Sequence, residues 1–340
     1  MKKGIKTALT ILLLLLLIAA AGTLAYTGER VYIGSVNLTD NEQTALDRER
    51  QLLACGIDPY VFSMTYNIEQ IYIASSLDSH KIPADFISID GEKNRDTAIL
   101  VHGLGGNRLS NYAVAELFLR HGWNVITYDQ RASGENLAKY NTFGYLESND
   151  AINYVNYADK LVDSDKRIVL WGTSFGGATV GVAMANDYVN SRVSAAVMDC
   201  PVSSMRDMVS FELEGISEST GMPAELMLWA GGIALKLHMG FSLEDVEITD
   251  YVNRSQIPLL VINSKADETT PFYMGQEIFF ASGADKKDIF TSPDSAHAHI
   301  FFDNPRQYER KMFGFIDSIP APIGEGETDE TENAGEPAAA

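Results

Sequence analysis

Basic residues are scarce in this sequence. Its 340 residues include 26 lysines and arginines but 46 aspartates and glutamates, which gives a net charge of −20 at pH 7. A protein whose main partner is a nucleic acid needs a basic face to neutralise phosphates, so this balance excludes that class of partner. We interpret the acidity as a solvated surface.

Cysteine is scarcer still, with only Cys55 and Cys200. No cluster of cysteine and histidine has the spacing of a zinc site, so we expect no metal, and no motif points to an organic cofactor. A disulfide between the two cysteines could form outside the cytosol. We favour the alternative that Cys200, which follows an apolar run, packs as a small hydrophobic residue.

Charge is absent from a long stretch near the N-terminus. Lysines occupy positions 2, 3 and 6 and the next charged residue is Glu29, so residues 7–28 form an uncharged run of 22 residues. That run is long enough to cross a bilayer, and the lysines favour a cytoplasmic N-terminus. We predict that residues 1–28 are a single-pass signal anchor and that the rest of the chain lies outside the cytosol. The alternative is a signal peptide cleaved near residues 19–21, which would release a secreted protein.

Large apolar residues are absent after Ile323, where the chain carries six acids and no base. Such a segment cannot bury enough surface to offset the entropy of ordering, so we expect residues 320–340 to be a disordered acidic tail. Near the other end, residues 29–67 carry no recognisable motif, although residues 41–57 have helical character. We expect a helical extension packed on the core, and a stalk near the membrane is the alternative.

The remaining chain, residues 68–319, alternates between β-rich apolar runs and segments with helical spacing. A continuous apolar run that ends in glycine, such as residues 97–103, is typical of a buried parallel strand. The alternation predicts an α/β fold with a mostly parallel central sheet flanked by helices. The expected strands are 69–75, 85–90, 97–103, 124–129, 167–172, 194–200, 258–264 and 287–293, and the expected helices are 110–122, 147–162, 176–188, 271–282 and 305–319.

A long insertion interrupts this alternation. The strands expected at 194–200 and 258–264 are separated by 57 residues, too many for an ordinary connection. Two stretches within the insertion, residues 204–216 and 222–241, have the pattern of amphipathic or strongly apolar helices and are rich in methionine. We predict a helical cap, at about residues 201–253, over the mouth of an active site. The alternative is that these helices pack on the edge of the sheet.

A serine flanked by glycines follows the strand expected at 167–172. The run GTSFG places Ser174 between the two glycines, and an alanine- and valine-rich helix comes next. A sharp strand-to-helix turn of this kind exposes a serine hydroxyl and leaves no room for side chains at the glycines. Such a serine becomes a nucleophile only with a base, an acid that orients the base, and donors for the oxyanion.

The chain offers candidates for the acid and the base. Asp267 follows the next-to-last expected strand in a polar loop and is the best candidate for the acid, while Asp199 is a competitor. Histidines 297 and 299 lie in the loop after the last strand, and because they alternate, we expect only one to point inward. The order Ser174, Asp267, His297 is one in which such triads occur.

Other acids and histidines have simpler interpretations. Asp129 is expected to be structural and to tie its loop together with Arg131. The remaining histidines are interpreted as surface residues (His80 and His121), as part of a turn (His102) and as a cap residue (His238).

The oxyanion needs donors of its own. The glycine-rich run HGLGGN ends an early strand, so its backbone can approach a ligand closely. We expect the N–H of Leu104 in this run to pair with the N–H of Phe175, the residue after Ser174.

Together these segments resemble the α/β-hydrolase superfamily, and within it the bacterial serine-aminopeptidase-like and esterase-like group, over roughly residues 68–319. The resemblance rests on ILVHGLGGNR, ITYDQRASGEN, FGYLESNDAINYV, LWGTSFGGATV, VMDCPVSSM, PLLVINSKADETTP and SAHAHIFFDNPRQYERKMFGFI. That group carries its base in an Ala/Gly-His-Ala loop before a Pro-x-x-Tyr helix start, which His297, Pro305 and Tyr308 match and His299 does not. One departure lies in DQRASGEN, where such proteins often show Arg-Gly-His-Gly-Glu-Ser.

The resemblance implies a serine hydrolase that acts by acyl transfer, with Ser174 as nucleophile, His297 as base and Asp267 as acid. A methionine- and leucine-rich cap predicts carboxylic esters with small or medium apolar acyl groups as substrates. One alternative is an aminopeptidase-like serine peptidase, and another is a non-catalytic, membrane-tethered binding domain. A peptidase would need an acid near the mouth to hold the ammonium of its substrate, and the candidates are Glu212, Glu214 and Glu268.

Overall fold

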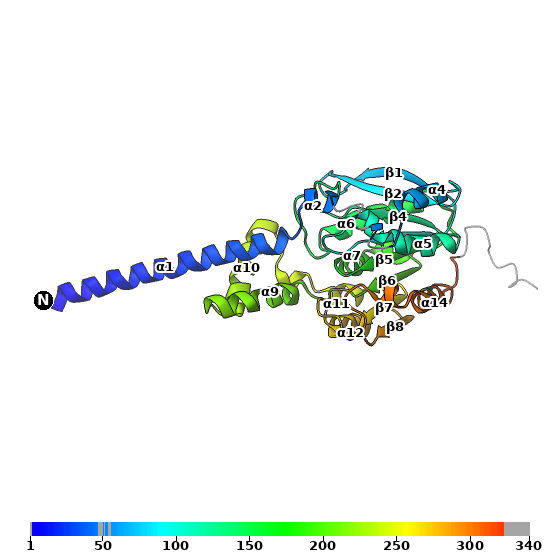
Figure 1. The fold of residues 1–340 in the computed structure, drawn as a ribbon. Helices are drawn as coiled ribbons and strands as arrows, with labels where there is room; N and C mark the ends of the chain where they lie inside the picture. Colours follow the sequence, from blue (N-terminus) through cyan, green and yellow to red (C-terminus); the bar gives the residue numbers. More distant parts are fainter. Residues whose placement is uncertain (1, 47–49, 51, 54–55, 323–340) are drawn as a thin grey trace, which may run out of the picture.

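The structure is a computed structural model of the chain, and it describes residues 2–46, 50, 52–53 and 56–322. Cys55 and all but the first three residues of the expected acidic tail lie outside the described residues. The described chain forms one body around a sheet, and a long N-terminal helix extends away from that body (Figure 1).

The sheet has eight strands in the order β1-β2-β4-β3-β5-β6-β7-β8. β2 pairs antiparallel with both β1 and β4, and all other neighbours are parallel. The prediction of a mostly parallel sheet flanked by helices is therefore confirmed. The strands are β1 (Asn67–Ala74), β2 (Lys81–Ser88), β3 (Thr97–Val101), β4 (Asn124–Tyr128), β5 (Ile168–Thr173), β6 (Ala195–Asp199), β7 (Leu259–Ser264) and β8 (Lys287–Ser292).

The central strands are continuously apolar because helices cover both of their faces. Every residue of β3, β4, β6 and β7 is buried, whereas the edge strands β1 and β8 have exposed positions. The helices that pack on the two faces are α6 (Glu147–Asp159), α7 (Phe175–Met184) and α12 (Phe272–Ala281) on one and α5 (Tyr112–Arg120) and α14 (Pro305–Ile316) on the other. Shorter helices are η1 (Arg108–Asn111), α8 (Asp187–Arg192), η2 (Leu243–Asp245), α11 (Ile248–Val252) and α13 (Ile300–Asp303).

The insertion between β6 and β7 forms two helices, α9 (Met205–Thr220) and α10 (Ala224–Met239). Each ends at a glycine in the left-handed region, Gly221 with φ 74° and Gly240 with φ 81°, as helix C-termini commonly do. Figure 1 shows α9 and α10 standing out from the body on the side from which the N-terminal helix leaves. We call α9 and α10 together the cap; that they cover the mouth of an active site stays a prediction.

The N-terminal helix α1 (Lys2–Val36) is a single helix of 35 residues. It does not end at Gly28, where the predicted anchor stops, but continues to Val36, because the residues of its last turns pack against the body. Residues 4–23 of α1, which include the leucine run, are exposed. Val31 and Val36 near its end are buried against the body. Among the residues that the structure describes, this is the one helix long and apolar enough to cross a membrane.

The described residues between α1 and β1 lie on the body. They include α2 (Asn41–Leu46) and α4 (Pro59–Thr65). Leu52 is buried, and Phe62 of α4 stacks on Tyr112 of α5 with ring centroids 4.6 Å apart. This part of the chain therefore adds to the core on the face covered by α5.

Candidate active site

Ser174 lies in a strained turn between β5 and α7. Its backbone angles are φ 54° and ψ −118°, which residues with a side chain rarely adopt. A Cβ on Gly172 would lie 2.3 Å from the carbonyl oxygen of Gly176, and a Cβ on Gly176 would lie 2.2 Å from the carbonyl oxygen of Val101. The turn can pack this tightly only because both positions are glycine.

His297 contacts both Ser174 and Asp267. Its Nε2 lies 2.9 Å from Oγ of Ser174, and its Nδ1 lies 2.8 Å from Oδ2 of Asp267. The three side chains follow the ends of three parallel strands, β5, β7 and β8, which meet at one edge of the sheet. His299 is exposed, and its ring packs near that of Phe302 instead. The structure therefore brings together the serine, acid and histidine named from the sequence.

Asp267 is held by several donors. Its Oδ1 accepts the backbone N–H groups of Thr269 and Thr270, both at 2.9 Å, and its Oδ2 accepts the Thr270 hydroxyl at 3.0 Å. Burial alone would raise the pKa of Asp267, but the hydrogen bond and charge of His297 and the backbone donors outweigh burial and lower it below its usual value. An ionised carboxylate thus faces the Nδ1 side of the imidazole.

Asp199, the competing acid, has different partners at the same edge. Its Oδ2 accepts a hydrogen bond from the hydroxyl of Tyr308 at 2.8 Å, and its backbone carbonyl accepts one from the N–H of Ser174 at 2.7 Å. Its Oδ1 is buried with no hydrogen-bond partner among the described residues. Burial raises the pKa of Asp199 to about 6. Asp199 thus supports the turn, while the acid bonded to His297 is Asp267.

The loop after β3 borders the same hydroxyl. A Cβ on Gly103 would lie 3.4 Å from the Cβ of Ser174, and Leu104 comes next in the chain. Phe175 is the first residue of α7, and N–H groups in the first turn of a helix have no partner within that helix. The two amides expected to serve as oxyanion donors therefore belong to segments that meet at Ser174.

His102 fixes the shape of this loop, in line with its interpretation as a turn residue. The ring is buried; its Nε2 accepts the N–H of Gln130 at 3.0 Å and its Nδ1 donates to the carbonyl of Gly103 at 2.7 Å. Burial lowers the pKa of His102, which keeps the ring in the neutral form that this bonding pattern requires.

A buried ion cluster that the sequence did not predict lies at the end of the loop after β3. Its central residue is Arg108, which follows that loop in the chain. The guanidinium of Arg108 contacts Asp85 of β2 at 3.0 Å, Glu135 at 3.0 Å, and Asp129 at the end of β4. The backbone N–H of Arg108 donates to Asp129 as well, at 2.8 Å. Acids at sequence distances of 21 to 27 residues leave no local pattern, so only the fold shows this cluster.

Two interpretations are corrected by these contacts. Asp129 does not pair with Arg131; Arg131 pairs with Asp78 at 2.7 Å, because Arg108 already occupies the buried side of Asp129. His80 is not a free surface residue, since only 13% of its side chain is exposed and its Nε2 lies 3.1 Å from the buried carboxylate of Asp150. His121 is half-exposed and stacks on a ring of α14, nearer to its expected place.

Phe175, the residue after Ser174, belongs to an apolar cluster that extends to the cap. The ring of Phe175 lies 5.3 Å from that of Phe143, and both belong to one buried cluster with Met205 of α9 and Met227 of α10. The three acids considered as ligands for a substrate ammonium are all exposed: Glu212, Glu214 and Glu268.

Among the described residues, one group of three side chains has ligand atoms close enough together to bind a single metal ion. Single ligand atoms of Cys200, Asp267 and His297 lie within 4.8 Å of one another. Cys200 is a free, buried cysteine, and burial raises the pKa of its thiol well above the usual value, so it keeps its proton and is a poor ligand. Since Asp267 and His297 already bond to each other, the group fits proton transfer better than metal binding.

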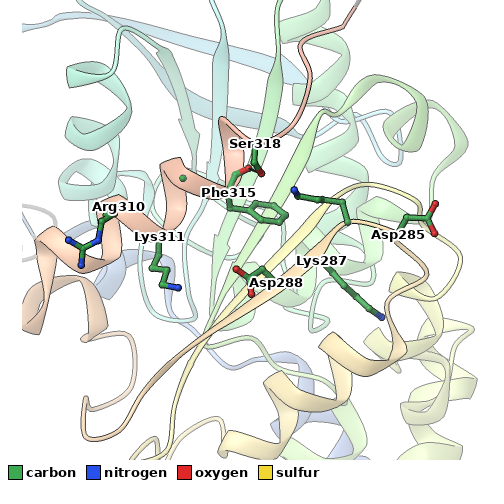
Figure 2. Close-up of a pocket in the computed structure, with 9 residues that line it drawn as sticks. Asp285, Lys287, Asp288, Arg310, Lys311, Phe315 and Ser318 are labelled. Carbon is green, nitrogen blue, oxygen red and sulfur yellow. Dashed lines mark hydrogen bonds between the residues drawn. The ribbon is translucent and has the colours of Figure 1, made fainter.

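A separate hollow of about 450 Å³ lies between β8 and α14. Figure 2 shows charged side chains around it, among them Lys287, Asp288 and Lys311, together with Phe315. Lys287 begins β8, whereas His297 follows the end of that strand, so the hollow lies toward the other edge of the sheet. None of the residues expected in the active site lines it.

Comparison with known proteins agrees with this architecture. Residues 98–225 match a protein family described as the alpha/beta hydrolase fold. The esterase Pf2001 of Pyrococcus furiosus superposes with a TM-score of 0.59 at 19% sequence identity, over 78% of this chain and 96% of that one. An esterase of Exiguobacterium antarcticum gives a TM-score of 0.54 at 18% identity, over 73% of this chain and 100% of that one. At these identities the likeness concerns the fold.

Several proteins also resemble the chain in sequence. The uncharacterized protein YqkD of Bacillus subtilis is 24% identical over 224 residues, which are 66% of this chain and 72% of that protein. The quorum-quenching protein AidA of Acinetobacter baumannii is 32% identical over 148 residues, which are 42% of this chain and 44% of that protein.

Proposed function

Since this chain has the α/β-hydrolase fold, we propose that it is a serine hydrolase that cleaves carboxylic esters by acyl transfer. The observation that carries the proposal is the position of His297, 2.9 Å from the hydroxyl of Ser174 and 2.8 Å from the carboxylate of Asp267. A binding domain that had lost catalysis would have no reason to keep these three side chains in contact around a strained serine.

In the first half of the reaction, Oγ of Ser174 attacks the carbonyl carbon of the ester while Nε2 of His297 takes the hydroxyl proton. Asp267 holds the Nδ1–H tautomer and stabilises the imidazolium that forms. The imidazolium then gives its proton to the leaving alkoxide, and the alcohol departs from the acyl-enzyme. In the second half, water attacks the acyl-enzyme with His297 again as base, and the carboxylic acid leaves as Ser174 regains its proton.

The negative charge of each tetrahedral intermediate falls on the former carbonyl oxygen. We assign its stabilisation to the backbone N–H groups of Leu104 and Phe175, whose segments meet at Ser174. Donors fixed in this way are most effective when they need no rearrangement as charge develops. The hydrogen bonds of His102 to Gly103 and Gln130 keep the loop of Leu104 in place.

The apolar cluster beside Ser174 and the solved neighbours of the fold support this substrate class. Apolar side chains around Phe175 and Met205 suit an apolar acyl group, and both solved neighbours described above are esterases. We expect p-nitrophenyl esters of short and medium acyl chains to be hydrolysed faster than aminoacyl p-nitroanilides. Faster turnover of the anilides would favour a peptidase instead.

The nucleophile is tested with a fluorophosphonate probe, which labels activated serines covalently. The wild-type chain should be labelled, and Ser174→Ala should not. Ser191→Ala, which removes an exposed hydroxyl bonded to a helix carbonyl on α8, serves as the matched control and should label normally. Labelling that persists in Ser174→Ala would place the nucleophile elsewhere.

The exposed apolar part of α1 supports a membrane anchor with the catalytic body outside the cytosol. The test is protease shaving of intact cells, followed by fractionation. A body that is cut only after lysis would place it on the cytosolic side, and a chain that begins near residue 22 in the medium would mean a cleaved signal peptide.

A further inference from the structure

The exposed face of the cap helix α10 is apolar. Leu226, Trp229, Ile233 and Leu237 recur every three or four residues and so lie along one side of the helix. Their exposed fractions are 38%, 59%, 44% and 80%, so a part of each side chain is open to solvent. We call these four residues the α10 stripe. A row of large apolar side chains on a soluble surface marks a place of contact.

α10 crosses α1 where the uncharged run of α1 ends. A Cβ on Gly28 would lie 2.5 Å from the carbonyl oxygen of Ala230, and a Cβ on Gly231 would lie 2.2 Å from Cγ1 of Val31. The backbones of the two helices therefore touch at this point, and Figure 1 shows the crossing at the end of α1 nearest the body. If residues 7–28 fill the bilayer, about 30 Å of helix at 1.5 Å per residue, the crossing lies at the membrane surface.

The order of these contacts shows which side of α10 faces the apolar part of α1. Ala230 meets Gly28, whereas Gly231, the next residue round the helix, meets Val31 one turn nearer the body. The side of α10 that carries Ala230 is therefore turned toward the N-terminal, apolar part of α1. The side that carries Gly231 is turned toward the body, where Leu235, four residues further on, is fully buried.

The α10 stripe adjoins Ala230, which is itself only 6% exposed because it packs against α1. Leu226, Ile233 and Leu237 lie four residues before, three after and seven after Ala230, which are the positions that stack on one helix face. This face thus looks along α1 toward the bilayer. Trp229 on the stripe and Tyr26 of α1, 68% exposed, are of the residue types enriched where membrane meets water.

We propose that the α10 stripe lies in the interfacial region of the bilayer that α1 crosses, with lipid as its cover. The proposal rests on α1 as a membrane segment and does not depend on the catalytic role of Ser174. The first charge after the run, Glu29, is bonded to His238 of α10 at 2.9 Å, so the two helices also share a polar contact at the level where headgroups begin.

Apolar burial, not charge attraction, is what holds this face to lipid. The net charge of −20 would repel the body from an anionic surface. On α10 the cationic side chain of Lys236 is already paired with Asp245 at 3.1 Å. The contact should therefore form with zwitterionic lipid and persist at high salt.

Trp229 is a built-in reporter, because the other two tryptophans, Trp123 and Trp171, are each only 3% exposed in the core. The full-length chain is reconstituted in phosphatidylcholine vesicles with and without bromine on the acyl chains near the headgroup, a quencher of tryptophan fluorescence. We expect bromolipid to quench part of the emission, and 0.5 M salt to leave the quenching unchanged. In Trp229→Phe the quenched part should disappear.

The control moves the reporter away from the membrane. In the Trp229→Phe background, Tyr60→Trp places a tryptophan at an exposed position (73%) on α4, a helix that Figure 1 shows at the end of the body away from α1. It should be quenched by aqueous acrylamide and not by bromolipid. Trp229 open to acrylamide and unaffected by bromolipid would overturn the proposal, and so would a chain that fails to enter vesicles. If Trp229 is shielded from both quenchers, a second copy of the chain covers the stripe, and the proposal of lipid contact is overturned as well.

Ester hydrolysis measured in the same vesicles separates the two proposals. Loss of quenching with hydrolysis intact contradicts only the membrane contact of α10. An inactive wild-type chain with Trp229 quenched contradicts only the hydrolase.

Discussion

Gly231 of α10 lies against Val31 of α1 so closely that an added Cβ would come within 2.2 Å of Cγ1 of Val31. Val31 is β-branched and has little freedom to move aside within a helix. The next residue, Gly232, faces open space, with no atom within 4 Å of an added Cβ. Gly231 and Gly232 are neighbours in one helix, but only Gly231 lacks room for a side chain.

This difference predicts opposite effects of the same substitution. Gly231→Ala should loosen the contact between α1 and α10, and the cap should be cleaved faster in limited proteolysis of the full chain. Gly232→Ala should leave the cap as resistant or more so, because alanine is better than glycine in a helix by about 1 kcal/mol. Equal cleavage of the two variants would mean that the close approach contributes nothing.

Substituting each of the two acids, Asp267 and Asp199, in turn separates their roles. Asp267→Asn should lower kcat for p-nitrophenyl esters by about 10⁴-fold, since the amide favours the wrong tautomer of His297. Asp199→Asn should keep kcat within about tenfold, because its oxygen can still accept from Tyr308 and it does not touch the base. Steady-state kinetics of both variants decide the matter, and the reverse ranking would make Asp199 the acid.

The raised pKa of Asp199 predicts a pH dependence of stability. Between its ordinary value of 3.8 and the folded value of about 6, the folded chain holds a proton that the unfolded chain has released. The stability contributed by that proton is fully present below about pH 4 and is lost as the pH rises through 6. Asp199→Asn cannot titrate, so its free energy of unfolding relative to wild type should rise by about 2 kcal/mol from pH 4 to pH 7.

Denaturant unfolding of both chains across this pH range measures the difference. Curves that stay parallel from pH 4 to pH 7 would show that Asp199 titrates at the same pH in the folded and unfolded chain.

The buried ion cluster predicts a large effect from one substitution. Arg108→Met would leave the carboxylates of Asp85 and Asp129 buried without their cation, at an expected loss of about 3–5 kcal/mol in the free energy of unfolding. Arg108→Lys should recover only part of this, since an ammonium cannot repeat the fork of contacts. The surface variant Arg306→Met is the control and should unfold like wild type. An Arg108→Met chain as stable as the control would show that the carboxylates do not depend on the guanidinium.

The sequence predicted the sheet and the three contacting residues for a common physical reason. Buried parallel strands are continuous apolar runs, and their carboxyl ends collect at one edge, so Ser174, Asp267 and His297 could be placed together before any coordinates. The left-handed turn at Ser174 also has a local signal, because only glycine fits beside it. The three residues are far apart in the chain, but each directly follows its own apolar strand, so the position of each in the sheet has a local signal.

Long-range partners carried no such signal. Nothing near Arg108 in the sequence marks Asp85 or Asp129, and Asp129 was assigned to Arg131 because that residue is close along the chain. His80 was interpreted as a surface residue for the same reason, although it meets the buried Asp150, 70 residues away. Composition predicted the apolar run of α1 but not that the helix continues past Gly28, because helices extend where tertiary packing supports them.

α1 enters the body as one helix of 35 residues, with no linker between its apolar run and the contact with the cap. A domain on a flexible tether explores a volume above the membrane, but a body joined by a continuous helix keeps one height and one tilt. Once α1 is in a bilayer, the mouth beside Ser174 moves only by lateral diffusion and by rotation about the membrane normal. If the site cleaves esters as proposed, its encounters with them are then set by their density in a thin layer at the membrane surface. Hydrolysis should therefore follow the surface concentration of substrate more closely than its bulk concentration.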